Sequence, residues 1–219
     1  MPSTYAIQAD EQRCDECGKG MAFPLFCDAC GADYPERSRM SPFGLLGLSR
    51  VFDIPDGEFE RRELQLARRL HPDKWLSRSE RLHRKALLAQ SAVNEALEAI
   101  RDPFRRAETL LRLTNEHRDG ALEAAGKRLP PGFLIDHLEL QESIQEGLDD
   151  QARKGLKKQA RRELKALQAT LAADFAGLTT AADSSPTRTT LLENIASAVS
   201  QSRYWRNTQA ALRGRAAPE

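Results

Sequence analysis

Four cysteines form the most chemically specific pattern in the 219-residue sequence, and all of them lie within 17 residues. They occur as two Cys-x-x-Cys pairs, each followed by glycine: Cys14 and Cys17 before Gly18, and Cys27 and Cys30 before Gly31. Two intervening residues let both sulfurs of a pair reach one metal ion, and glycine permits the tight backbone reversal. Four thiolates complete the closed tetrahedral set of a structural zinc site, with mononuclear iron as the chemical alternative. Because a closed site has no open coordination position, we expect it to stabilise folding and to catalyse nothing.

Two disulfides are the other possible use of these cysteines, and the expected compartment argues against them. Residues 1–13 lack the apolar segment of a secretory signal, and Asp10 and Glu11 are atypical of an organellar presequence. No run of 18 apolar residues occurs, which predicts no transmembrane helix and no membrane partner. These features predict a cytoplasmic protein, or a mitochondrial matrix protein if a presequence has been removed.

A second signal is the tripeptide His71-Pro72-Asp73, which lies in a predicted loop over residues 70–79 between two predicted helices. The helix before it carries an apolar side and many arginines. The helix after it carries apolar residues at spacings of three and four: Leu82, Ala86, Ala89, Val93, Leu97 and Ile100. Neither helix can bury its stripe alone, so we expect them to pack antiparallel with the tripeptide at the tip. A plain proline turn is the alternative interpretation.

The remaining elements predict an all-α fold with little room for a sheet. Residues 1–40 form the tetracysteine segment, 41–115 the first helical region, 116–132 a hinge rich in glycine and proline, and 133–219 a C-terminal helical domain. Three apolar stripes, interrupted near residue 148 and over residues 177–190, predict a three-helix bundle or a bent helical hairpin. The tetracysteine segment is expected to be a small zinc-ribbon-like unit.

The tripeptide in its loop, with a basic helix before it and Lys74 after it, resembles the signature of the J-domain family. Three further blocks resemble HscB-type co-chaperones of iron–sulfur cluster assembly: residues 41–48 (SPFGLLGL), residues 93–111 with Val93-Asn94-Glu95-Ala96 and DPFRRAETLL, and residues 132–142 (GFLIDHLELQE). The resemblance implies a J-domain hairpin followed by a C-terminal scaffold-binding domain. It implies a partner chaperone of the DnaK/HscA type and a scaffold partner of the IscU type.

The same resemblance implies roles for individual residues. The tripeptide would stimulate ATP hydrolysis on the chaperone. The flanking cations would dock on an acidic groove of that chaperone; they are Arg61, Arg62, Arg68, Arg69 and Lys74. The family's scaffold-contact positions fall on Leu134, Ile135, Leu138, Glu139, Glu142 and Tyr204. Tyr204 and Trp75 stand where the family usually has phenylalanine, and we expect Trp75 to preserve function.

Each of these expectations has a simpler structural alternative. The arginines could form an ordinary solvated helix face. Leu134 and Leu138 could belong to the core of the bundle, since periodicity does not distinguish inward from outward faces. No phosphate-binding loop or nucleophile motif appears, so an enzyme in its own right is not expected. A net charge of +1 and a single lysine between the cysteine pairs argue against a nucleic-acid-binding zinc ribbon. A general J-protein for unfolded clients is the remaining alternative.

Overall fold

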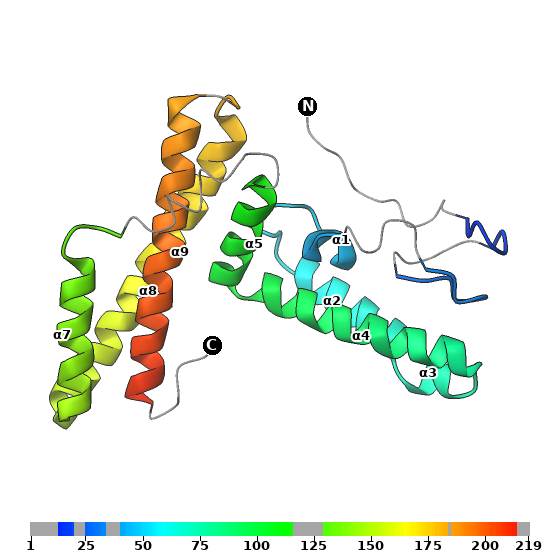
Figure 1. Cartoon of the computed structure of the whole chain (residues 1–219), viewed down its shortest axis with the longest axis horizontal. Helices are drawn as coiled ribbons and strands as arrows, with labels where there is room; N and C mark the ends of the chain where they lie inside the picture. Colours follow the sequence, from blue (N-terminus) through cyan, green and yellow to red (C-terminus); the bar gives the residue numbers. More distant parts are fainter. Residues whose placement is uncertain (1–12, 20–24, 34–39, 116–128, 184, 214–219) are drawn as a thin grey trace. The chain divides into compact units, whose positions relative to one another are not determined.

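A computed structural model describes residues 13–19, 25–33, 40–115, 129–183 and 185–213 (Figure 1). In these ranges the chain is mostly helical, and an isolated bridge joins the extended residues Phe26 and Asp33. The helices are α1 (Pro42–Leu46), α2 (Glu58–Leu70), α3 (Asp73–Leu76), α4 (Glu80–Arg101), α5 (Pro103–Asn115), α7 (Phe133–Glu146), α8 (Asp150–Thr180) and α9 (Pro186–Leu212).

The chain divides into two compact units, residues 1–109 and residues 110–219, and the boundary falls within α5. The predicted hinge lies mostly outside the described residues; its last part, residues 129–132, leads through a turn into α7. None of the helices in the described ranges is both long enough and apolar enough to cross a membrane.

The core of the first unit lies between α2 and α4, with α1 packed on α4. Arg101 at the end of α4 pairs with Glu63 near the start of α2, so the two helices run antiparallel as predicted. Their buried faces carry the predicted stripe, from Leu66 and Leu70 to Leu82, Ala86, Ala89, Val93, Leu97 and Ile100. Ser79 caps α4 by accepting a hydrogen bond from the Leu82 amide, 3.4 Å away. Burial of these stripes fixes the position of the intervening tripeptide.

Two short helices in the first unit differ from the sequence-based expectation. Residues 70–79 are not a plain loop, because Asp73–Leu76 form α3, with Pro72 at its N-cap position. Residues 42–46 form α1, whose start could have been found from Ser41 and Pro42. The Ser41 hydroxyl accepts a hydrogen bond from the Gly44 amide at 3.2 Å, and proline occupies the first turn.

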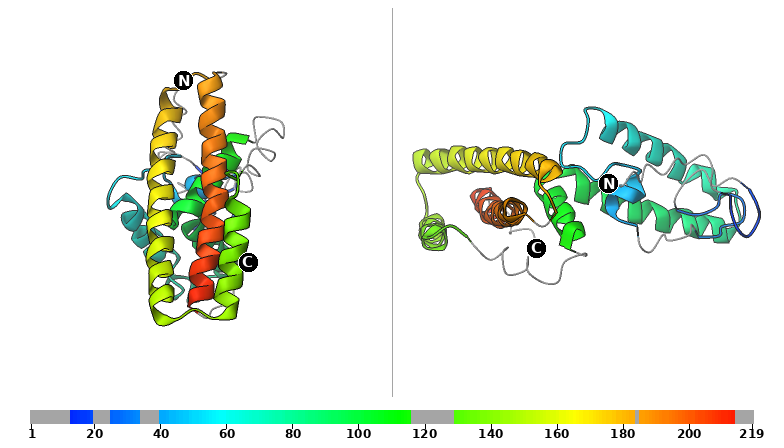
Figure 2. Two further views of the ribbon diagram at one scale, coloured as in Figure 1. Left: turned by 90° about the vertical axis from the view of Figure 1, so that its left-hand side faces the viewer. Right: turned by 90° about the horizontal axis from the view of Figure 1, so that it is seen from above.

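The second unit contains α7, α8 and α9, which lie side by side in Figure 2 and form the predicted three-helix arrangement. The α8 stripe is buried or half-buried throughout: Leu156, Ala160, Leu164, Leu167, Leu171, Phe175 and Leu178. The predicted interruption over residues 177–190 is too long, because α8 continues to Thr180 and α9 begins at Pro186. Gly177 lies inside α8, where a Cβ would approach the Leu191 side chain to 3.2 Å, so glycine here permits close helix packing.

Candidate functional site

The two cysteine pairs adopt the same backbone turn. In the first, the Gly18 amide donates to the Cys14 carbonyl at 2.8 Å, and the Cys14 amide donates to the Lys19 carbonyl at 2.8 Å. In the second, the Gly31 amide donates to Cys27 at 2.9 Å, and the Cys27 amide donates to Ala32 at 2.8 Å. Gly18 and Gly31 have φ values of 68° and 76°, in the left-handed region that favours glycine. Each turn therefore presents two sulfurs on one side.

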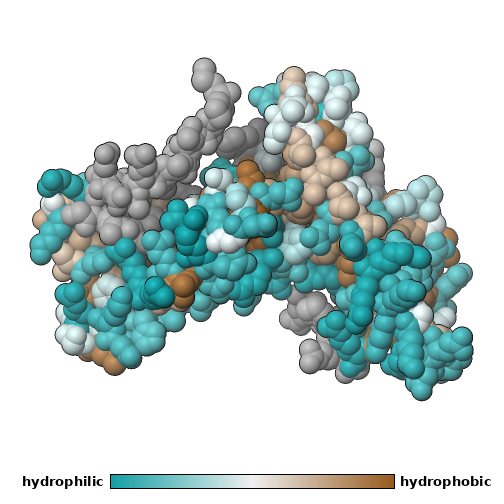
Figure 3. Space-filling view, turned by 180° about the vertical axis from the view of Figure 1, so that it is seen from behind, coloured by the Kyte–Doolittle hydropathy of each residue, from teal (hydrophilic) through white to brown (hydrophobic). Residues whose placement is uncertain are grey.

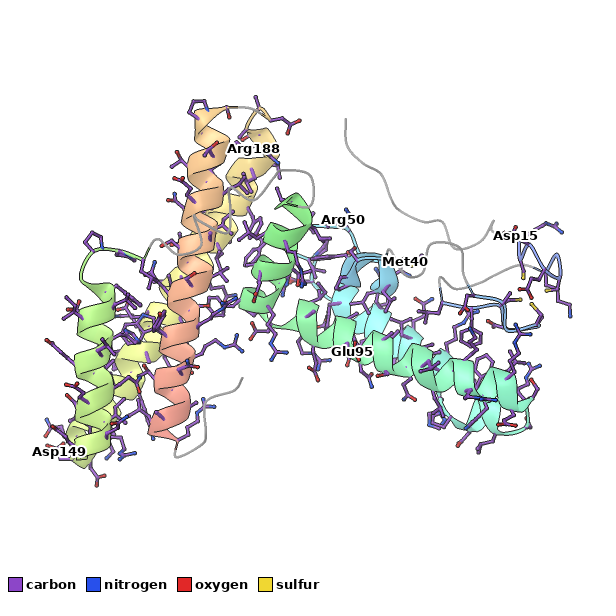
Figure 4. The ribbon with its side chains drawn as sticks, viewed as in Figure 1. Asp15, Met40, Arg50, Glu95, Asp149 and Arg188 are labelled. Carbon is purple, nitrogen blue, oxygen red and sulfur yellow. The ribbon has the colours of Figure 1, made fainter. Side chains whose placement is uncertain are left out.

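The four sulfurs fit a single metal ion. All lie within 4.8 Å of one another, and the Cys14–Cys30 and Cys17–Cys27 Sγ pairs are 3.6 Å apart. A tetrahedron with zinc–sulfur bonds of about 2.3 Å places its sulfurs about 3.8 Å apart, close to these distances. A disulfide would need about 2.05 Å, so the arrangement does not match two disulfides. Figure 4 draws the yellow sulfur atoms gathered between the two turns, with Asp15 on the first.

Protonation of the thiols depends strongly on this crowding. Burial raises the pKa of Cys27, but the backbone amides of Cys30 and Ala29 donate to its sulfur and lower the pKa to about 7. The Ala32 amide lowers the pKa of Cys30, but burial and the neighbouring thiols raise it to about 12. Closely spaced thiols cannot all ionise without a compensating cation. A metal ion bound here would displace the remaining protons and hold the two turns together.

The tripeptide lies at the tip of the α2–α4 hairpin, where α2 ends at Leu70 and α3 begins at Asp73, and its three residues are exposed. The His71 ring nitrogen Nδ1 lies 3.4 Å from the Asp73 amide, which donates to it, and 3.6 Å from the Asp73 carboxylate. Trp75 is 5% exposed, and its indole Nε1 donates to the Arg69 carbonyl at 3.2 Å. The loop is thus fixed on one side by a buried tryptophan and presents its polar side chains to solvent.

The predicted docking cations fall into two groups. Arg61, Arg68 and Lys74 are exposed, and Arg61 and Arg68 lie two helical turns apart on one side of α2. Arg62 and Arg69 are half-buried; Arg62 donates to the Gln65 side chain at 3.2 Å, and Arg69 pairs with Asp28 at 2.9 Å. The face of this hairpin visible in Figure 3 is mostly hydrophilic. The first group offers its charge to a partner more readily than the second.

The predicted scaffold-contact residues lie in the second unit, mostly on the solvent side of α7. Leu134 is 47% exposed, Ile135 63% and Leu138 64%. Glu139 and Glu142 are also exposed and border them. We call these five residues the α7 strip. The three apolar side chains are therefore surface residues, and the interpretation of Leu134 and Leu138 as bundle core is wrong.

The opposite face of α7 packs on α9 through an aromatic cluster that the sequence did not reveal. His137 is buried and stacks on Phe133, with ring centroids 4.8 Å apart. The rings of Tyr204 and Trp205 meet His137 edge-on, at 5.5 and 4.7 Å. The Thr208 hydroxyl lies 3.3 Å from His137 Nε2. Tyr204 is half-buried in this cluster, so it lies behind the α7 strip and supports α7 from α9.

Burial also changes the chemistry of the histidine in this cluster. It lowers the pKa of His137 below its ordinary value, although hydrogen bonding to the Tyr204 backbone and the nearby Asp136 carboxylate raise it. Neutral His137 is therefore the form that the packed α7–α9 contact favours.

This chain is similar to known proteins in both sequence and structure. The model of the HSCB C-terminal oligomerisation domain matches residues 129–213. The co-chaperone protein HscB homolog of Chromobacterium violaceum is 32% identical over 132 residues, covering 60% of this chain and 74% of the relative. The homolog of Ralstonia nicotianae is 33% identical over 104 residues, 48% of this chain and 57% of the relative. The match thus spans little more than half of the Ralstonia protein.

Two solved structures share the fold. The crystal structure of human co-chaperone protein HscB has a TM-score of 0.69 and 22% identity, covering 92% of this chain and 97% of that chain. The chaperone HscB from Vibrio cholerae has a TM-score of 0.61 and 22% identity, covering 80% and 96%. Together with the Chromobacterium relative, of which about three quarters is matched, these likenesses agree with the tripeptide hairpin and the helices that follow it. The chain belongs to the HscB co-chaperone family.

Proposed function

We propose that this protein stimulates the ATPase of a DnaK/HscA-type chaperone and delivers an IscU-like iron–sulfur cluster scaffold to it. It would thereby assist cluster assembly and transfer, and it would act as an activator of its partner without catalysing a reaction itself. A cytoplasmic site of action stays a prediction.

The observation that carries the proposal is the exposed tripeptide at the tip of a helical hairpin, in a chain of this family. A carboxylate such as Asp73 can pair with a cation on an ATPase, and the proline restricts the loop, which lowers the cost of ordering it on binding. Arg68 and Lys74 are exposed close to it in the chain, Arg61 is exposed two turns further back on α2, and the three cations suit an acidic groove. These features support contact between the first unit and the chaperone.

The second unit supports the scaffold part of the proposal. The α7 strip has an apolar centre bordered by two carboxylates, which is the arrangement of a desolvated contact with a polar rim. Exposed apolar side chains that lie together on one helix face commonly mark an interaction surface, and docking of a scaffold would account for those on α7. The strip and the tripeptide belong to different compact units, so one protein could hold both partners.

We propose zinc as the resident metal of the four cysteines, in a structural role. The core cluster around the sulfurs is small, with Cys14, Cys27 and Ala32 buried and Cys30 and Met40 packed against it, so a metal would supply folding free energy that this core cannot.

The deciding experiment is single-turnover ATP hydrolysis by a cognate DnaK-type chaperone, measured with this protein, with the scaffold, and with both. We expect stimulation by the protein alone and a larger effect when the scaffold is present. Absence of stimulation at saturating protein would refute the proposal. Equal stimulation with the scaffold or with unfolded model peptides would identify a general J-protein instead.

A further inference from the structure

The second cysteine turn packs directly on the tip of the α2–α4 hairpin. Leu25 and Phe26, which precede Cys27, are buried, and Phe26 is only 3% exposed. The Phe26 ring lies 5.2 Å from the ring of Trp75, at an interplanar angle of 57°. Trp75 is the buried residue of α3, the four-residue helix that begins within the tripeptide. The metal-binding segment therefore covers the side chain that anchors this loop.

Polar contacts tie the same turn to both long helices of the hairpin. Asp28 accepts from Arg69 of α2 at 2.9 Å, across 41 residues of sequence. Asp33 pairs with Lys85 of α4. A Cβ on Gly31 would come within 3.3 Å of a Leu82 methyl group, so the turn lies directly against α4. The turn is thus attached to α2, α3 and α4 at once.

The attachment bears on the loop because α3 is a four-residue helix whose buried side chain is Trp75. Pro72 at the N-cap position supplies no side-chain cap, and the inward contact of α3 is Trp75, whose indole donates to the Arg69 carbonyl. Arg69 and Trp75 stand on either side of the tripeptide, and the second cysteine turn contacts both of them. Moving Phe26 and Asp28 away would expose Trp75 and break the Arg69–Asp28 ion pair together.

The cysteine turns cannot keep this position by a core of their own. Their buried cluster consists of Cys14, Cys27 and Ala32, with Cys30 and Met40 half-buried beside it. A unit of this size has too small a core to fold by itself, and a metal joined to its four ligands would supply the missing stability. We therefore expect occupancy of the four sulfurs to hold Phe26 and Asp28 in place.

We propose that the metal-bound second turn is a brace for the His71-Pro72-Asp73 loop, so that chaperone stimulation depends on metal occupancy. Phe26 and Asp28 are positioning residues that act through Trp75 and Arg69. This inference rests on the proposed function for its consequence, but the coupling between metal and loop stands on the contacts alone.

Fluorescence of Trp75 tests the coupling without any partner. The chain has two tryptophans, so Trp205→Phe leaves Trp75 as the single reporter. Chelation of the metal should shift its emission to the red, because Trp75 loses Phe26 and meets water. Asp28→Asn should loosen the loop while retaining the metal, with metal content measured by elemental analysis. Asp15→Asn is the matched control, since Asp15 holds the corresponding position in the first turn and is exposed.

Single-turnover ATP hydrolysis then tests the consequence. Metal removal should raise the half-saturating concentration of the protein by roughly three- to tenfold, the equivalent of losing one aromatic contact. Asp28→Asn should act in the same direction, and Asp15→Asn should match the unmodified protein. Unchanged Trp75 emission after chelation, or stimulation by the metal-free protein equal to or above that of the metal-bound protein, would overturn the brace. Failure of the metal-bound protein to stimulate would refute the proposed function instead, while the emission shift would still decide whether metal and loop are coupled.

Discussion

Leu138→Ala separates a docking role of the α7 strip from a packing role. Leu138 is 64% exposed, so only about a third of its side chain is withdrawn from water in the folded protein. Complete burial of a leucine stabilises by about 1.5–3 kcal/mol, which assigns about 0.5–1 kcal/mol of folding free energy to Leu138. The exposed two thirds would contribute about 1–2 kcal/mol if a scaffold covered them, a loss of about 5- to 30-fold in affinity on truncation.

The assay is titration calorimetry of the variant with an IscU-like scaffold, beside a thermal melt. The matched control is Leu140→Ala on the same helix, because Leu140 packs against the cluster of Leu156, Ala160 and Trp205. We expect the control to lower stability toward the lower end of the about 2–5 kcal/mol of core truncations and to act on affinity less than Leu138→Ala. Combining Leu134→Ala, Leu138→Ala and Glu142→Ala should cost at least about tenfold in affinity while leaving basal ATPase stimulation unchanged. Unaltered scaffold affinity in the Leu138 variant would show that the docking surface lies elsewhere.

Further predictions concern the metal, the tripeptide, the tryptophan and the buried histidine. The purified protein should contain one zinc per chain by elemental analysis, and Cys27→Ser should lower hydrogen-exchange protection mainly over residues 13–19 and 25–33 while α2 and α4 stay protected. His71→Gln should abolish ATPase stimulation with an unchanged melting temperature, because the side chain is exposed. Trp75→Phe should cost about 0.5–1.5 kcal/mol in a denaturant titration, because the bond to the Arg69 carbonyl is lost. The pKa of His137 is lowered in the folded state, so the unfolded chain binds more protons and the second unit should lose stability as pH falls below about 6.5. His137→Gln should flatten that dependence in melts.

The sequence predicted the features that local patterns encode. Two Cys-x-x-Cys-Gly repeats define their own turns, so the tetrahedral set of sulfurs could be expected from residue types and spacing alone. The stripes of α4 and α8 are long and strongly periodic, and both are found on buried faces. The position of the tripeptide at the tip of a hairpin followed from the two helices predicted on either side of it.

Contacts between distant segments could not be predicted in this way. No spacing in the sequence relates Asp28 to Arg69 or Phe26 to Trp75, which are paired only once the chain has folded. The direction of Leu134 and Leu138 was equally undetermined, because a helix with apolar residues on both faces gives no single inward side. Here His137 and Phe133 occupy the inward face, and a histidine is not normally expected there.

The single-sided attachment of α7 has a consequence for how the second unit opens. Helices α8 and α9 lie side by side along their lengths (Figure 2). Helix α7 packs inward only through the face that carries Phe133, His137 and Leu140. Local opening costs less free energy where fewer apolar contacts must separate, so α7 should detach while α8 and α9 remain paired. We therefore expect the surface proposed for the scaffold to belong to a segment with its own folding equilibrium. Binding of a partner to α7 would stabilise its closed form, which makes cargo recognition and the ordering of this helix a single linked event.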